Sequence, residues 1–249
     1  DRCYYYDPST GETTDPKFVS VLIDVLREHL SSDLEISVVE SDASAMKCKY
    51  AFKMLGYEEM AREKGVKLVN LSKERNKKVK MKIADEHLRF RIPQTIYESD
   101  LLVNVPKIKY MSVVKTTCAL KNIYGCNAHP KKSIYHHALD EAIVGINKLI
   151  RTDLVVVDGI IVSGINTWRL GLVMASEDPV ATDVAASRIL GVNPRTVKYI
   201  TLASKEGIGN THFIQKGESI IYFKNHFPRK RTRNKMLSFL ASIYLRYFA

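Results

Sequence analysis

Apolar residues recur with a helical period in some segments of the chain and a strand period in others. From residue 15 to 30 they return every three or four positions, which predicts an amphipathic helix. Pro16 stands at its first turn, where proline is tolerated, and Thr13, Thr14 or Asp15 can cap that turn. The pattern then predicts a strand, a helix and a second strand, at 34–39, 49–64 and 66–71.

The second half of the chain continues this alternation. We expect a hairpin at 78–91 and a buried strand at 100–105, which leads into a lysine-rich segment with a helix at 115–122. Further strands are predicted at 154–157 and 170–175, and further helices at 139–150, 179–190 and 194–205. The predicted fold class is α/β: a mostly parallel sheet with helices on both faces, plus a C-terminal apolar helix. Residues 1–223 are expected to form a single domain.

Residues 224–249 are predicted to be a basic segment followed by that helix. From Met236 to Ala249 only Ser238, Ser242 and Arg246 are polar, so the helix must be covered by something. At 1.5 Å per residue it reaches ~21 Å, short of the ~30 Å hydrocarbon core of a membrane. We expect it to dock on the body or on another subunit. The alternative is an anionic membrane surface, favoured by the cations just ahead of it.

Composition and charge narrow the class of protein. The chain has 249 residues, with 45% hydrophobic and 38 Lys and Arg against 27 Asp and Glu, which argues against disorder. Seven basic residues and no acidic ones follow Glu218. The rest of the chain therefore carries a formal net charge of only 31 − 27, or +4. Without a recognition motif, nucleic acid is an unlikely partner. Residues 73–82 are read first as a solvated strand face and second as an anion or nucleic-acid contact.

The cysteines indicate the compartment. Cys3, Cys48, Cys118 and Cys126 are scattered and make no paired motif, which favours a reducing, cytoplasmic setting and buried thiols. No leader follows the first residue, so a signal peptide is expected to be absent or removed. The glycines at 164–171 lack the spacing of a dinucleotide fingerprint.

Candidate ligand-binding residues stand where predicted strands end, since ligands of such sheets bind beyond the carboxyl ends of the strands. One cluster consists of lysines: Lys107, Lys109, Lys115 and Lys121. Such a cluster favours binding of phosphate or carboxylate, and it is expected to lower the pKa of one lysine enough for that lysine to take part in a reaction. Its alternative reading is a solvated basic helix face. The remaining residues selected in this part of the chain are Ser41, Asn122 and Gly159.

Carboxylates supply the candidate acid–base and metal chemistry. Glu40 and Asp158 end strands, and each is expected to act as a ligand or as a general base. Asp158 and Asp183 are the candidate ligands of a divalent cation, and Asp183, on a helix, is expected to pair with Lys107 or Lys121. Asp178 before a proline has the position of a helix cap.

The three histidines of the 129–137 segment do not have the spacing of a metal pair. His129, His136 and His137 are expected at the surface or as caps. The alternative is that one of them transfers a proton near neutral pH.

Six ordered motifs resemble the domain of unknown function 362 family. They are T-T-D-P at 13–16, V-V-E-S at 38–41, V-N-V-P-K-I-K at 103–109, A-L-K-N-I-Y-G at 119–125, V-V-D-G-I at 156–160 and S-E-D-P-V-A-T-D at 176–183. The resemblance implies an α/β protein and adds Thr14 and Asp15 to the candidate ligand-binding residues. Members are often associated with iron–sulfur clusters, but the cysteine cluster is missing here, so no such cofactor is expected. The family's strand ahead of T-T-D-P is also missing, and Tyr110 replaces a common histidine.

These observations predict a cytoplasmic, or peripheral membrane, α/β protein with a cleft at the strand ends. Lys121, Asp158 and Glu40 are the candidate catalytic residues, and the cleft is expected to bind a small anionic ligand, with a divalent cation as a further expectation. Whether the protein is an enzyme stays open. The alternatives are a scaffold that acts through its C-terminal helix and a nucleic-acid binder that uses its basic patches.

Overall fold

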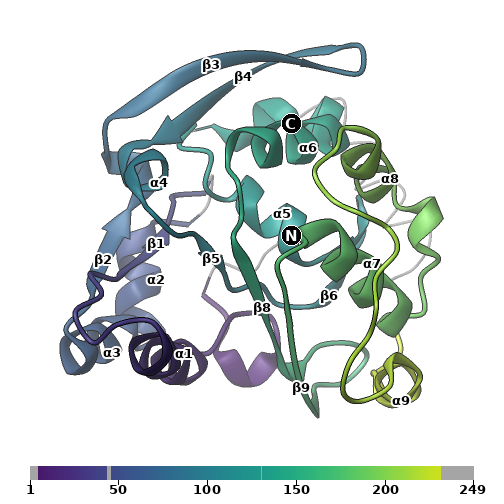
Figure 1. The fold of residues 1–249 in the computed structure, drawn as a ribbon, viewed down its shortest axis with the longest axis horizontal. Helices are drawn as coiled ribbons and strands as arrows, with labels where there is room; N and C mark the ends of the chain where they lie inside the picture. The colour runs from purple at the N-terminus through teal and green to yellow at the C-terminus, as the bar shows by residue number, and fades with distance from the viewer. Residues whose placement is uncertain (1–4, 44–45, 130, 231–249) are drawn as a thin grey trace.

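The computed structural model describes residues 5–43, 46–129 and 131–230, and within them helices and strands alternate along the chain (Figure 1). The predicted mixed α/β composition is confirmed. The strands of the described residues form small mixed sheets rather than one mostly parallel sheet. Two strand pairs are parallel: β1 (Ser37–Glu40) with β2 (Lys67–Asn70), and β5 (Val103–Asn104) with β8 (Leu154–Val162).

The N-terminal part packs three helices beside β1 and β2. A 3-10 turn, η1 (Pro8–Thr10), precedes α1 (Pro16–His29), which starts as predicted because the Asp15 carboxylate accepts from Lys17 N–H at 2.8 Å. The helix predicted at 49–64 is two helices, α2 (Cys48–Met54) and α3 (Tyr57–Lys64). Gly56 separates them at φ 83°, a conformation that suits glycine. Val19 and Ile23 of α1 are buried with residues of both helices.

A long hairpin follows and crosses the top of the molecule in Figure 1. After the 3-10 turn η2 (Leu71–Lys73), β3 (Asn76–Ile83) pairs antiparallel with β4 (Glu86–Pro93), as predicted, and α4 (Gln94–Glu98) comes next. The inner face of the hairpin packs on α6 (Leu139–Leu149). A Cβ on Gly145 of this helix would lie 2.7 Å from the Phe90 ring. Glycine therefore lets the helix approach the hairpin closely.

The predicted strands at 154–157 and 170–175 are a long hairpin, not two parallel strands. β8 pairs antiparallel with β9 (Trp168–Ser176), joined by residues 163–167. A connection this short can only reverse the chain, because a parallel return needs a crossover of roughly a dozen residues or more. The expectation of a mostly parallel sheet overlooked this loop length.

The lysine-rich segment also differs from its prediction as a single helix at 115–122. Residues 109–117 form a small hairpin, β6 (Lys109–Met111) with β7 (Lys115–Thr117), and α5 (Ala119–Tyr124) begins only after it. The 3-10 helix η3 (Lys132–Ala138) then leads into α6.

Helices close the right side of the molecule in Figure 1. They are α7 (Pro179–Ile189), the 3-10 turn η4 (Pro194–Thr196), α8 (Lys198–Lys205) and α9 (Ile220–His226). The boundary predicted after residue 223 falls within α9, and Phe227 just beyond it is buried against Tyr110 with ring centroids 5.7 Å apart. The predicted apolar helix at 236–249 lies outside the described residues. Within the described part of the chain, no helix is long and apolar enough to cross a membrane.

The close approach of α6 to the hairpin is testable by Gly145→Val. The added side chain collides with Phe90 and with Ile83, whose nearest atom is 3.3 Å from the Cβ position. We expect a loss of roughly 1–3 kcal/mol in the free energy of urea unfolding, the usual cost of overpacking. Lys148→Val, at an exposed position of the same helix, serves as the control and is expected to cost less. Equal losses would contradict the packing argument.

Candidate functional site

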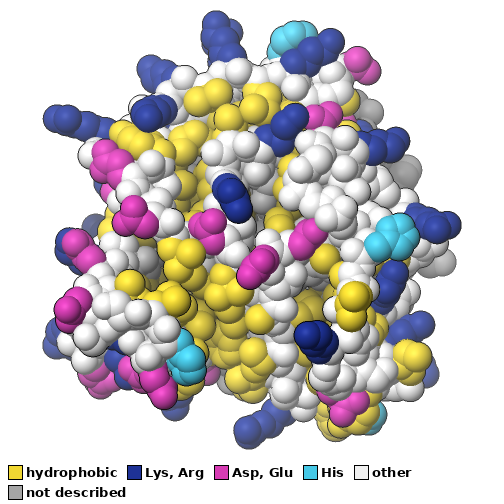
Figure 2. Space-filling model, viewed as in Figure 1, with side chains coloured by type: hydrophobic (Ala, Val, Ile, Leu, Met, Phe, Trp, Pro, Cys, Tyr) yellow, Lys and Arg dark blue, Asp and Glu magenta, His cyan; other side chains and the backbone are white. Residues whose placement is uncertain are grey.

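A cleft of about 2930 Å³ separates the N-terminal part, with α1 and β1, from the part with β5 and α5. Hydrophobic side chains gather in the hollow near the middle of the face shown in Figure 2, with charged side chains beside them. The volume exceeds the roughly 300–1,000 Å³ of a typical small-molecule pocket. A small ligand would therefore occupy only part of it, and the polar residues decide which part.

β1 and β5 border the cleft, and each has an edge without a strand partner among the described residues. The Ile36 carbonyl accepts from β2 at 3.0 Å, and the Leu102 carbonyl accepts from β8 at 3.4 Å. Peptide groups alternate in direction along a strand, so those of Val39 and Val103 point away from these partners, towards the cleft sides of the two strands. The cleft thus interrupts what would otherwise be a continuous sheet.

Lys107 and Asp158 form a buried ion pair beside the cleft. The Lys107 Nζ lies 3.1 Å from Asp158 Oδ2 and donates to the Ile161 carbonyl at 2.7 Å, and the two side chains are only 5% and 1% exposed. Burial lowers the pKa of Lys107, while the Asp158 carboxylate acts in the opposite direction. Asp158 also accepts from the backbone N–H of Asp15 at 3.1 Å. The pair therefore joins the chain ahead of α1 to the central strand.

The T-T-D-P segment and the second predicted lysine meet in the same region. The Thr14 hydroxyl donates to the Val105 carbonyl at 3.2 Å, just beyond the end of β5. The buried Lys109 Nζ lies 3.4 Å from a carboxylate oxygen of Glu12 and donates to its carbonyl at 3.0 Å. Thr14, Lys107 and Lys109 all line the cleft. Asp15, in contrast, uses its side chain as the cap of α1.

The other side of the cleft carries a polar cluster around Ser41, at the end of β1. The Ser41 hydroxyl donates to the Gly125 carbonyl at 2.5 Å, and Lys132 Nζ donates to the same carbonyl at 2.7 Å and to the Ser41 hydroxyl. Burial lowers the pKa of Lys132, while nearby Glu40 opposes that shift. The Glu40 carboxylate accepts from Ser41 N–H at 2.6 Å, and both residues line the cleft with Lys132.

Lys132 is not among the residues selected from the sequence. There, residues 129–137 are read as a loop and a helix start with three histidines, and no local pattern marks a lysine that contacts Ser41, a residue far away along the chain. The spacing of Lys132 from Gly125 also gives no sign of their contact. Only the paired motifs V-V-E-S and A-L-K-N-I-Y-G, whose ends it joins, pointed to this place.

α5 supplies the residues between these two clusters. The Asn122 side-chain amide donates to Asn104 Oδ1 at 2.8 Å, which ties the helix to the end of β5. Lys121, one position earlier, lies with its Nζ 6.0 Å from the centre of the Tyr124 ring and lines the cleft. His136 lines it too, and its buried Nδ1 has no hydrogen-bond partner among the described residues. Burial and the charge of Lys121 lower the pKa of His136, which favours its neutral form.

Asp183 does not join this group and does not pair with a lysine. Its carboxylate accepts from Leu120 N–H at 3.0 Å and from the Tyr199 hydroxyl at 2.8 Å, and burial raises its pKa to about 7. Asp178 caps α7 as expected, accepting from Val180 N–H at 2.8 Å. Asp183 therefore fixes the start of α5, and with it the position of Lys121.

The described residues contain no group of three or more His, Cys, Asp or Glu side chains arranged to hold a metal ion. Asp158 and Asp183, the two predicted metal ligands, are engaged by different partners, Lys107 and Tyr199. Gly159 lies in β8, where a Cβ would meet Leu172 at 2.9 Å, so its role is close strand packing.

Seven predicted residues therefore line one cleft. They are Thr14, Glu40, Ser41, Lys107, Lys109, Lys121 and Asn122. Asp158 stands directly behind Lys107, whereas Asp15, Gly159 and Asp183 have structural contacts beside it or elsewhere.

Comparison with known proteins gives a family model and a relative. The model described as "Domain of unknown function (DUF362)" matches residues 4–188. A thylakoid-associated protein of Synechocystis sp. is 28% identical over 139 residues, which are 51% of this chain and 43% of that protein. The chain thus spans less than half the length of this curated relative. No solved structure matches the chain.

Removing the charge of Asp158 tests the buried pair. In Asp158→Asn the Lys107 ammonium stays buried without its carboxylate, and we expect a loss of about 3–5 kcal/mol in the free energy of urea unfolding. Asp24→Asn, which breaks the more exposed pair with Lys64, is the control and is expected to cost under about 1 kcal/mol. Adding Lys107→Met to Asp158→Asn should recover part of the loss. Equal effects of the two single changes would contradict this assignment.

The raised pKa of Asp183 predicts a dependence of stability on pH. Between the ordinary carboxyl pKa of 3.8 and about 7, the unfolded state releases a proton that the folded state keeps. The contribution of Asp183 to the free energy of unfolding is therefore fully present below pH 3.8. It falls by an amount on the order of a few kcal/mol as the pH rises to about 7. Asp183→Asn keeps an acceptor for Leu120 N–H and removes this titration. We expect the unfolding free energy of the parent to fall relative to the variant between pH 5 and pH 8, and a constant difference would refute the prediction.

Proposed function

We propose that this chain, which belongs to the domain of unknown function 362 family, binds a small anionic ligand with phosphate or carboxylate groups in its central cleft. The observation that carries the proposal is the convergence of lysines from separate segments on one cavity: Lys107 and Lys109 after β5, Lys121 on α5 and Lys132 on η3. An ammonium group is a strong donor to such oxygens.

The inner lysines and the outer ones have different parts in this proposal. Lys107 and Lys109 are held by carboxylates, so their charge is largely balanced and they shape the floor beneath the ends of the strands. Lys121 lies one helical turn before Gly125, and Lys132 contacts Gly125 and Ser41, where hydroxyl and peptide groups add donors. We place the anionic group of the ligand between Lys121 and Lys132.

If the protein is an enzyme, the same region supplies a proton acceptor. Neutral His136 has an Nδ1 without a partner among the described residues and lines the cleft with Lys121, and Glu40 lies across from Lys132. A lysine that orients the anion and a histidine or glutamate that takes a proton would suffice for general-base chemistry. No step is assigned to a metal, because the described carboxylates do not assemble a site.

A second candidate function is association with a membrane surface. The curated relative is named as thylakoid-associated, and the chain carries a formal charge of +11. The sequence interpretation assigned this role to the C-terminal segment, most of which lies outside the described residues. We also propose that the part of the chain ahead of this C-terminal segment lies in the cytoplasm.

Thermal unfolding with a panel of phosphorylated and carboxylated metabolites tests the cleft. A ligand at a hundred times its Kd adds about 2.7 kcal/mol of stability, which corresponds to a Tm rise of roughly 5–10 °C for a chain of this size. We expect Lys121→Ala to weaken binding of the ligand that stabilises the parent at least about tenfold. Lys205→Ala, at an exposed position on α8, should leave that binding unchanged. The proposal fails if no anion on the panel shifts the Tm of the parent, or if the two variants respond alike.

A further inference from the structure

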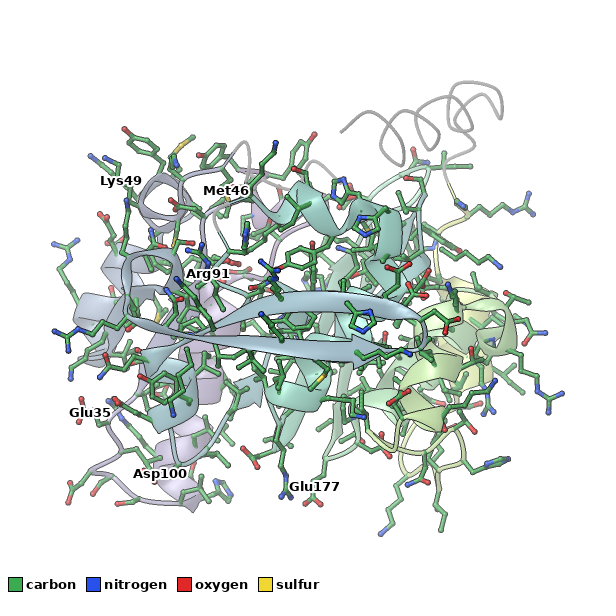
Figure 3. The ribbon with its side chains drawn as sticks, turned by 90° about the horizontal axis from the view of Figure 1, so that it is seen from above. Glu35, Met46, Lys49, Arg91, Asp100 and Glu177 are labelled. Atoms are coloured by element: carbon green, nitrogen blue, oxygen red, sulfur yellow. The ribbon has the colours of Figure 1, made fainter. Side chains whose placement is uncertain are left out.

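The outer face of the β3–β4 hairpin is almost entirely basic. Side chains alternate between the two faces of a strand, and the inner face carries Val79, Phe90 and their neighbours against α6. The outer face carries Lys78, Lys80, Lys82, His87, Arg89 and Arg91, which we call the basic ribbon. Figure 3 looks onto this hairpin from above, with Arg91 labelled along it, and Figure 2 shows Lys and Arg side chains projecting from the corresponding edge.

The register places these basic residues directly opposite one another. Lys78 pairs with Arg91, Lys80 with Arg89, and Lys82 with His87. Like charges in such positions destabilise a strand pair. A protein that needed only a solvated strand face would gain by alternating lysine with glutamate or threonine.

The ribbon also lacks neutralising partners. None of its lysines and arginines forms an ion pair with an acidic side chain in the described residues. All of its members are exposed except Arg91, which is half-buried. Glu86, near the turn, lies on the opposite face, and its carboxylate is 3.9 Å from His137. Within the part of the chain that the structure describes, no acidic side chain therefore relieves the repulsion.

The shape of the ribbon distinguishes between possible polyanions. Cations spaced by about 6.6–6.8 Å along each strand and roughly 5 Å across lie on one side of a two-stranded ribbon, so a flat surface can reach all of them together. Proteins that bind single-stranded nucleic acids usually stack the bases on Phe, Tyr or Trp, and the outer face of this hairpin carries none of these residues. The arrangement fits a planar layer of anionic headgroups better.

We propose that the basic ribbon is a docking surface for an anionic lipid bilayer. This proposal identifies a surface for the membrane association considered above. It does not depend on the cleft ligand or on residues 231–249. Contact replaces the repulsion between facing cations by attraction to lipid phosphates and carboxylates. Each basic residue at an anionic surface strengthens binding about fivefold, and the effect weakens as salt screens it.

Vesicle sedimentation with the full chain tests this surface. The probes are vesicles of phosphatidylcholine alone and vesicles in which roughly one-third is phosphatidylserine. The variant Lys80→Gln with Arg89→Gln removes two ribbon charges, and the control Lys53→Gln with Lys205→Gln removes two charges from exposed positions on α2 and α8. Both variants keep the C-terminal segment and the same net charge.

We expect the parent to bind only the vesicles that contain phosphatidylserine. The ribbon variant should bind them about 25-fold more weakly, and the control within about twofold of the parent. Because the like charges are relieved, the ribbon variant should also unfold at a temperature about 1–3 °C higher than the parent.

Four outcomes would overturn the proposal. If none of the proteins binds the vesicles, a lipid surface is excluded. If vesicle binding is weakened equally in the two variants, only net charge matters. Retention of binding by the ribbon variant assigns the contact to another segment. Preferential binding of duplex DNA over vesicles at the same salt concentration would replace the lipid with a nucleic acid. None of these outcomes depends on the cleft, so the anionic-ligand proposal stands or falls separately.

Discussion

A buried ammonium–carboxylate pair holds together the centre of this protein. Lys107 and Asp158 are almost completely removed from water, and the carboxylate also accepts from the backbone at Asp15. Each charge would be costly to bury alone, so each requires the other. The pair aligns the segment before α1, the end of β5 and the middle of β8. These elements form one side of the cleft, which means that the pair fixes the site's geometry even though its charges balance.

The cleft is a break between two small sheets. β1 and β5 each leave one edge without a strand partner among the described residues, and the side chains beyond their ends reach α5. Ser41 contacts the carbonyl at the end of that helix, while Asn104 contacts Asn122 one turn earlier. The short helix is therefore the bridge across the carboxyl ends of the strands. It carries Lys121, and the Gly125 carbonyl just after it accepts a hydrogen bond from the buried Lys132.

Electrostatics has opposite roles in the cleft and on the hairpin. In the cleft, Lys107, Lys109 and Lys132 are buried, and nearby carboxylates and carbonyls offset part of their desolvation cost. On the hairpin, facing cations stay in water and repel one another. The first arrangement suits the small anionic ligand that we propose for the cleft. The second suits a large flat partner, because water screens the repulsion until a partner with opposite charge arrives.

The sequence by itself determined the family, many of the elements and seven of the residues that line the cleft. The helical repeat predicted α1, alternation predicted a hairpin at 78–91 that the structure extends to 76–93, and the ends of the motifs supplied the seven lining residues. Tertiary structure decided the rest. Loop length made β8 and β9 antiparallel, and Asp183 found Leu120 N–H and Tyr199 rather than a lysine. Lys132 became part of the site through contacts with distant residues. Periodicity and capping depend on neighbours along the chain, whereas burial and ion pairing depend on neighbours in space, which a single sequence does not specify.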